Sequence, residues 1–88
     1  MWDVVYLPEA EEERAELPTK ERNSLDNAVE KLEQIGPTLP FPHSSSVQGW
    51  DDLRELRPRA GQSPWRAFYR QVADDPFVIA AIGPETRK

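Results

Sequence analysis

The sequence predicts a small α+β domain with the element order β-α-α-β-β-β, in which a helical hairpin covers one face of an antiparallel sheet. Three observations carry this prediction. An apolar stripe at helical spacing runs through residues 25–35, an aromatic and β-branched segment occupies residues 2–7, and three strand-like segments separated by turns fill residues 53–82. With 88 residues in total, we expect one domain that spans 1–88.

The N-terminal half predicts one strand followed by two helices. Residues 2–7 read as the strand, and Pro8 with the acidic residues after it suits the first turn of a short helix that ends near Leu17. Pro18 interrupts that helix, because an interior proline loses a hydrogen bond and clashes with the preceding turn. A second helix starts near Thr19 and ends at Gly36, and its apolar stripe consists of Leu25, Ala28, Val29, Leu32 and Ile35.

The C-terminal half predicts a long connection and then three strands. Residues 37–52 form the connection, and we expect its three serines, 44–46, to be a flexible tip. Strands are expected at 53–57, 65–72 and 77–82, and the continuous apolar character of the last one predicts a central strand that is covered on both faces. The expected core consists of Val5, Leu25, Val29, Leu32, Leu56, Val78 and Ile82.

The composition excludes several classes of site. The chain has no cysteine, which excludes disulfides, thiolate metal sites and cysteine nucleophiles, and its single histidine excludes a multi-histidine metal centre. We therefore expect neither a metal nor any other cofactor. No apolar run approaches 18 residues and no signal peptide precedes the first strand, so we expect no membrane association and a cytoplasmic location.

The charge is distributed unevenly along the chain. The net charge is −5 and the isoelectric point about 4.8, which taken alone disfavours a polyanionic partner. However, residues 1–52 carry twelve acids and four basic residues, whereas residues 53–88 carry four acids and seven basic residues. This asymmetry directs the search for an anion-binding site to the C-terminal part.

Several short motifs carry a resemblance to a known family. Residues 53–57, with the sequence LRELR, resemble the "L-x-E-L-R" strand of the phage-derived HigB-like branch of the RelE/ParE superfamily of toxins. Residues 64–69 (PWRAFY) are similar to the strand that follows in that family, residues 36–43 to its "G-P-x-L-x-x-P-H" segment, and residues 77–83 to its last core strand. The similarity covers nearly the whole chain.

The resemblance implies a RelE-like fold and a type II toxin whose partner is a cognate antitoxin. It also implies action on the ribosome and its mRNA as an endoribonuclease, and a dimer or a toxin–antitoxin hetero-oligomer as possible assemblies. Two features depart from the family: the chain is acidic, and it ends just after the last strand, so we expect that it lacks a C-terminal segment that several relatives have or that it is a minimal member. RelE carries catalytic lysines where this chain has Leu53 and Glu55, and those roles are not transferred.

The residues themselves suit RNA cleavage by attack of a 2′-hydroxyl on the adjacent phosphate. This reaction needs a base that accepts the 2′ proton, cations that stabilise the phosphoryl oxygens and an acid that protonates the leaving 5′ oxygen, and it needs no metal. Alternation along the strands predicts that Arg57 and Arg66 lie close together with Glu55 beside them, and the resemblance implies a phosphate contact for Arg66. Further candidate RNA contacts are Arg54, Arg70, His43, Arg87 and Lys88.

Two alternatives stay open. The arginines can instead be structural and form ordinary surface ion pairs. If Arg66 contacts the phosphate, its replacement should weaken toxicity and leave stability nearly unchanged, because an arginine on an open sheet face is not part of the core. The protein can also be a non-catalytic member of the same fold, either a gyrase inhibitor of the ParE type or a degenerate toxin that only binds its antitoxin. The acidic isoelectric point favours this second alternative.

Overall fold

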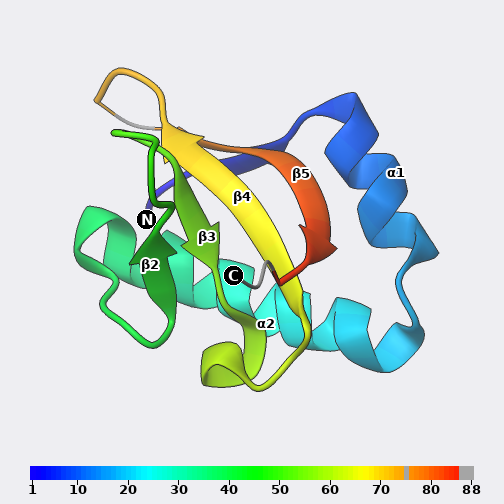
Figure 1. Ribbon diagram of the computed structural model, residues 1–88. Coiled ribbons are helices and arrows are strands. Elements are labelled where there is room, and N and C mark those ends of the chain that lie inside the picture. Colours follow the sequence, from blue (N-terminus) through cyan, green and yellow to red (C-terminus); the bar gives the residue numbers. More distant parts are fainter. Residues whose placement is uncertain (75, 86–88) are drawn as a thin grey trace.

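A computed structural model describes residues 1–74 and 76–85 and confirms the α+β class. Figure 1 shows one sheet with two helices beside and behind it. The helices are α1 (Pro8–Glu16) and α2 (Thr19–Ile35), and the strands are β1 (Val4–Tyr6), β2 (Ser44–Ser46), β3 (Arg54–Leu56), β4 (Trp65–Gln71) and β5 (Phe77–Pro84). A short 3₁₀ turn at Gly36–Thr38 follows α2, and a tight turn at Pro58–Gly61 follows β3. In the described part of the chain, neither helix is long and apolar enough to cross a membrane.

The sheet has the strand order β1-β5-β4-β3-β2. Strand β1 runs parallel to β5, and the other three pairings are antiparallel, as expected for a mainly antiparallel sheet. The central strand is β4, which Figure 1 shows in yellow, and not β5. The prediction that the last strand is covered on both faces was wrong, because its outer residues Val78 and Ala80 line an open groove on the face away from the core.

The helices begin and end where the sequence places them. Pro8 occupies the first turn of α1, and α1 stops at Leu17, whose extended backbone leads into Pro18. Helix α2 ends at Gly36, which has a positive φ of 78° and packs against the indole of Trp2. A Cβ atom at this position would overlap that ring, so the stop of α2 requires glycine for two separate reasons.

The core lies between the helices and one face of the sheet. The expected core residues Leu25, Val29, Leu32, Leu56 and Ile82 are buried there. Val5 is 47% exposed and Val78 only half-buried, so these two assignments were wrong. The two residues pair with each other across β1 and β5 on the face away from the core. Their strand neighbours, which include Val4, Tyr6, Phe77 and Ile79, pack on the core instead.

A bulge in β5 allows both ends of this strand to contribute to the core. Phe68 pairs with Ala81 and Tyr69 with Ile79, which leaves Ala80 as an extra residue. This extra residue shifts the alternation, so that Phe77, Ile79 and Ile82 all face the helices.

The serines at 44–46 form strand β2 and not a flexible tip. Ser44 is fully buried, pairs with Leu56, and shares a hydrogen bond of 2.6 Å with the hydroxyl of Tyr69. Serine has no strong preference for strands, and this tertiary hydrogen bond comes from a residue 25 positions away. The local sequence therefore gave no signal of the strand.

Candidate functional site

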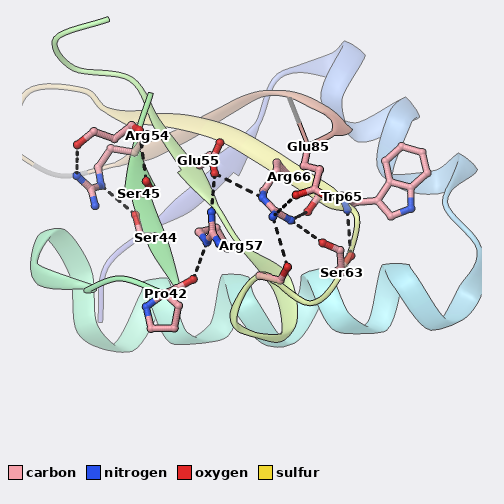
Figure 2. A network of polar contacts seen from close by, with 12 residues as sticks. Pro42, Ser44, Ser45, Arg54, Glu55, Arg57, Ser63, Trp65, Arg66 and Glu85 are labelled. Carbon is pink, nitrogen blue, oxygen red and sulfur yellow. Dashed lines mark hydrogen bonds and ion pairs between the residues drawn. The ribbon is translucent and has the colours of Figure 1, made fainter. Parts of the chain in front are cut away.

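Two arginines and two carboxylates form a connected ion-pair network on the face of the sheet away from the core. Glu55 on β3 lies between the arginines: its Oε2 accepts a hydrogen bond of 3.0 Å from Arg57 Nη1 and lies 3.5 Å from Arg66 Nε. Arg66 on β4 also donates from Nη2 to Glu85 Oε2 at 3.0 Å. Figure 2 shows this row from Arg57 through Glu55 to Arg66 and Glu85. The predicted closeness of Arg57, Glu55 and Arg66 is confirmed.

Arg66 is buried, with only 2% of its side chain exposed. Its Nη1 donates to the carbonyl oxygens of Ser63 at 2.6 Å and Trp65 at 2.9 Å, and Nη2 also reaches Gly61 O at 3.4 Å. The expectation that this arginine lies on an open sheet face was wrong, because the turn after β3 and Glu85 cover it. The guanidinium therefore holds that turn against the sheet.

Arg57 is more accessible, with 20% of its side chain exposed. Its Nε donates to Pro42 O at 2.9 Å, and its guanidinium carbon lies 4.9 Å from the centre of the Phe41 ring. The guanidinium also lies directly against Gly61, where a Cβ atom would come within 2.6 Å of Nη2. These contacts fix the orientation of the guanidinium and leave part of it open to a ligand.

The turn that covers Arg66 has an unusual backbone. Arg59, Ala60 and Gly61 all have positive φ values, a conformation that costs non-glycine residues about 1–2 kcal/mol each. Helix α2 stabilises this turn through Glu21, which accepts hydrogen bonds from Arg59 Nη2 and, at 2.8 Å, from Ser63 Oγ. Helix α2 thus supports the network indirectly, through the turn.

The other candidate residues lie apart from this network. Arg54 points toward the opposite face and donates to Ser44 Oγ at 2.9 Å. Arg70 is exposed at the far end of β4 and lies 3.6 Å from Asp52, in a solvent-exposed ion pair. His43 lines a hollow beside Arg57. The candidate contacts Arg87 and Lys88 lie outside the described residues.

An apolar groove of about 510 Å³ occupies the same sheet face near Arg70. It is lined by Leu7, Trp50, Leu53, Val72, Val78 and Ala80, with Arg70 and Asp52 at its polar side. Trp50 is 65% exposed, so its indole is available to a partner and is not a packing residue.

The arrangement can bind an anion and accept a proton. Glu55 offers a carboxylate as the proton acceptor, and Arg57 offers a partly open guanidinium fork to phosphoryl oxygens. The two arginines and two glutamates balance in formal charge. Among residues 1–74 and 76–85, no group of three or more histidine, aspartate or glutamate side chains is arranged to hold a metal ion.

Sequence reasoning missed three partners of the network. Glu85 comes after the last expected strand, Phe41 lies in the expected loop, and Ser63 lies in the expected turn. Glu85 and Phe41 contact the network through the fold, since Glu85 is 19 positions from Arg66 and Phe41 is 16 positions from Arg57, whereas Ser63 lies only three positions from Arg66. The local sequence carries no signal of such contacts, apart from the polar character of Glu85 and Ser63.

The chain is similar to known proteins in both sequence and structure. The family model described as "Phage derived protein Gp49-like (DUF891)" matches residues 12–82. A comparison with curated protein sequences gives no match.

Solved structures share the fold at low sequence identity. RelE in the intact RelBE toxin-antitoxin complex of E. coli is 15% identical, with 99% of this chain and 100% of that chain covered and a TM-score of 0.77. The archaeal RelE-RelB complex from Pyrococcus horikoshii contains a chain that is 21% identical, with 99% and 98% covered and a TM-score of 0.70. A chain of the YoeB dimer from Staphylococcus aureus is 13% identical, with 99% of this chain and 98% of that chain covered and a TM-score of 0.70.

Proposed function

Because the chain belongs to the phage-derived Gp49-like family, we propose that it is the toxin of a type II toxin–antitoxin pair. The RelE fold over the full described length supports this proposal. The partner is a cognate antitoxin encoded beside it, by analogy with the RelE chains that were crystallised with RelB. The toxin acts in the cytoplasm, where ribosomes translate mRNA.

The proposed reaction is ribosome-dependent cleavage of mRNA by 2′-hydroxyl attack. The observation that carries it is the position of Glu55 between two guanidinium groups on the sheet face that the helices leave open. In this mechanism Glu55 accepts the proton of the 2′-hydroxyl as that oxygen attacks the phosphorus, while Arg57 donates hydrogen bonds to the phosphoryl oxygens. The bond from phosphorus to the 5′ oxygen breaks, which leaves a 2′,3′-cyclic phosphate, and the departing 5′ oxygen takes its proton from water. Both side chains are partly exposed, at 16% and 20%.

Arg66 has a different part in this mechanism. Since its side chain is 2% exposed and already hydrogen-bonded to three carbonyl groups and Glu85, it positions Glu55 and the covering turn. Direct contact of Arg66 with the scissile phosphate requires Glu85 and the turn at residues 58–63 to move aside.

The charge balance of the network favours a second candidate function. Both arginines already have carboxylate partners and the chain carries a net charge of −5, which weakens attraction to a phosphate. A non-catalytic member of the fold, directed at gyrase or only at its antitoxin, fits this feature.

Replacement of Glu55 by glutamine tests the proposed reaction. Glu55→Gln keeps the side-chain volume but removes the proton acceptor, so we expect the cleavage rate to fall about a hundredfold or more. The assay induces each protein in cells and maps new mRNA 5′ ends, with thermal denaturation confirming that the variant folds. Glu30→Gln, on the exposed side of α2, is the control and leaves cleavage unchanged.

The outcomes separate the two candidate functions. Growth arrest without new 5′ ends in the parent protein supports the binding function. If a folded Glu55→Gln protein cleaves mRNA as fast as the parent, the role of Glu55 is refuted. A parent protein that neither arrests growth nor cleaves mRNA removes the toxin proposal itself.

A further inference from the structure

The hollow beside Arg57, which His43 lines, has a volume of about 150 Å³ and adjoins the ion-pair network. It forms where α2, the turn after β3 and the segment before β2 meet. Its polar lining comes from Ser24, Asn27 and Lys31 on α2, His43 before β2, Arg57 after β3, and Arg59 in the turn. Figure 1 shows that turn, in yellow-green, close to α2.

Local structure brings these side chains together from distant parts of the sequence. Asn27 and Lys31 are four positions apart and therefore lie on the same side of α2. The left-handed backbone at Arg59 turns the chain back toward α2, where Glu21 binds this arginine. Arg57 is shared, because it lines the hollow and also binds Glu55 of the network.

The charged residues that line the hollow are all basic, although the chain is acidic overall. Three of the nine lining residues are Lys or Arg, one is the only histidine of the sequence, none is Asp or Glu, and the others are neutral, with Ala28, Leu56 and Ala60 apolar. Arg57 and Arg59 have their carboxylate partners, Glu55 and Glu21, outside the lining. Lys31 makes no ion pair and no side-chain hydrogen bond within residues 1–74 and 76–85. The ammonium of Lys31 is therefore a positive charge of the hollow that an anion can neutralise, beside the guanidinium groups of Arg57 and Arg59.

We propose that this hollow binds a backbone phosphate of the RNA strand, next to the phosphate held at Arg57 and Glu55. This inference rests on the proposed function and adds an RNA subsite built on α2. The volume admits a phosphate group, and Arg57 connects the hollow with the network, so one strand can contact both. A planar guanidinium and an ammonium are the groups that proteins use for phosphate oxygens.

The test compares two lysines on the same helix. Lys31 lines the hollow, whereas Lys20, near the start of α2, is exposed and does not. Binding of the full chain to a 2′-O-methylated octaribonucleotide, which cannot be cleaved, is measured by fluorescence anisotropy. The salt concentration is varied from roughly 50 to 200 mM, a range over which phosphate contacts change the affinity measurably. We expect Lys31→Gln to lower the magnitude of the slope of log K against log salt by about 0.7, the value for one phosphate contact on a single strand. Lys20→Gln leaves the slope unchanged.

His43 supplies an independent readout, because it is the only histidine and its ring protons are resolved by NMR. We expect these signals to shift on addition of the octaribonucleotide to the parent and to shift much less in Lys31→Gln. Inorganic phosphate alone, at the same concentration of phosphate groups, is expected to shift them weakly, since it lacks the neighbouring contacts of a strand.

Several results overturn the proposal. These are an equal loss of slope in Lys31→Gln and Lys20→Gln, His43 signals that do not move when RNA binds, and a parent that binds no oligonucleotide. A response to inorganic phosphate as strong as the response to RNA assigns the hollow to free phosphate, and a stronger response to an acidic peptide assigns it to a protein partner. The mRNA 5′-end assay separates this subsite from the proposed function. If the parent cleaves mRNA but the two lysine variants bind RNA alike, the subsite is refuted and the proposed function stands.

Discussion

Arg66 shows how a residue that the sequence places in the functional site can be built into the packed structure instead. Its guanidinium is buried between Glu55 and Glu85 and donates to three backbone carbonyl groups. Its Nε lies 3.5 Å from Glu55 and makes no hydrogen bond among the described residues. A buried ion pair adds little net stability over an apolar replacement, but removal of one partner leaves a charge in a desolvated site.

At the scale of this residue, Arg66→Ala is expected to lower the free energy of unfolding by about 3–5 kcal/mol, the usual cost of breaking a buried ion pair. The loss arises because Glu85 and Glu55 each lose the arginine partner at position 66 and the turn at 58–63 loses its anchor. Urea denaturation followed by circular dichroism measures the change. Arg70→Ala, which removes an exposed arginine from the same strand, should change stability by no more than about 0.5 kcal/mol. Unchanged stability of Arg66→Ala would show that the arginine has no structural role.

At the scale of elements, the two helices are joined to each other and to β1 by one polar cluster. Arg14 on α1 donates from Nε and Nη2 to the two carboxylate oxygens of Asp26 on α2, at 2.9 and 2.7 Å. Tyr6 on β1 lies beside this pair, and burial raises the pKa of its hydroxyl to about 12, with a smaller opposing effect from Arg14. The folded state therefore keeps Tyr6 protonated at pH values where the unfolded chain releases the proton.

This cluster predicts a loss of stability at alkaline pH. The pKa of Tyr6 is raised from 10.0 to about 12 on folding, so above pH 10 the unfolded chain binds fewer protons than the folded protein, and stability falls as pH rises toward 12. Tyr6→Phe removes this contribution. Between roughly pH 9 and 11.5, a range set by these two pKa values, the urea midpoint of the variant should fall less than the urea midpoint of the parent. Parallel declines in the two proteins would assign the alkaline transition to other groups.

At the scale of the whole molecule, the two faces of the sheet differ in what covers them. The helices cover one face, and the other carries the ion-pair network at one end and the apolar groove with Trp50 at the other. Exposed apolar surface beside a polar site is typical of protein interaction surfaces. The open face is therefore the part of the molecule on which we expect substrate and antitoxin to compete.

Co-expression tests the partner proposal. The product of the adjacent open reading frame is expected to relieve growth arrest and to co-purify with the chain as a stable complex, while an antitoxin from an unrelated pair does neither. Light scattering of the free chain and of the complex then gives the assembly, dimer or hetero-oligomer. Growth arrest that persists at matched expression of the adjacent gene product would contradict this partner.

The sequence by itself determined the fold class, the two helices and the meeting of Glu55, Arg57 and Arg66 at the network. The stripe from Leu25 to Leu32, the stops at Pro18 and Gly36, and the alternation that brings Glu55 near Arg57 and Arg66 are local patterns, and local patterns are readable from sequence.

The tertiary structure alone decided what these patterns could not specify. The strand at 44–46 exists because Tyr69 and Leu56 are there to bind it, and Val5 is exposed because the register of β1 against β5 turns Val4 and Tyr6 inward. Arg66 is buried because Glu85 and a turn held by α2 close over it. Each of these outcomes depends on contacts between residues far apart in the chain, and their energies appear only once the elements have packed.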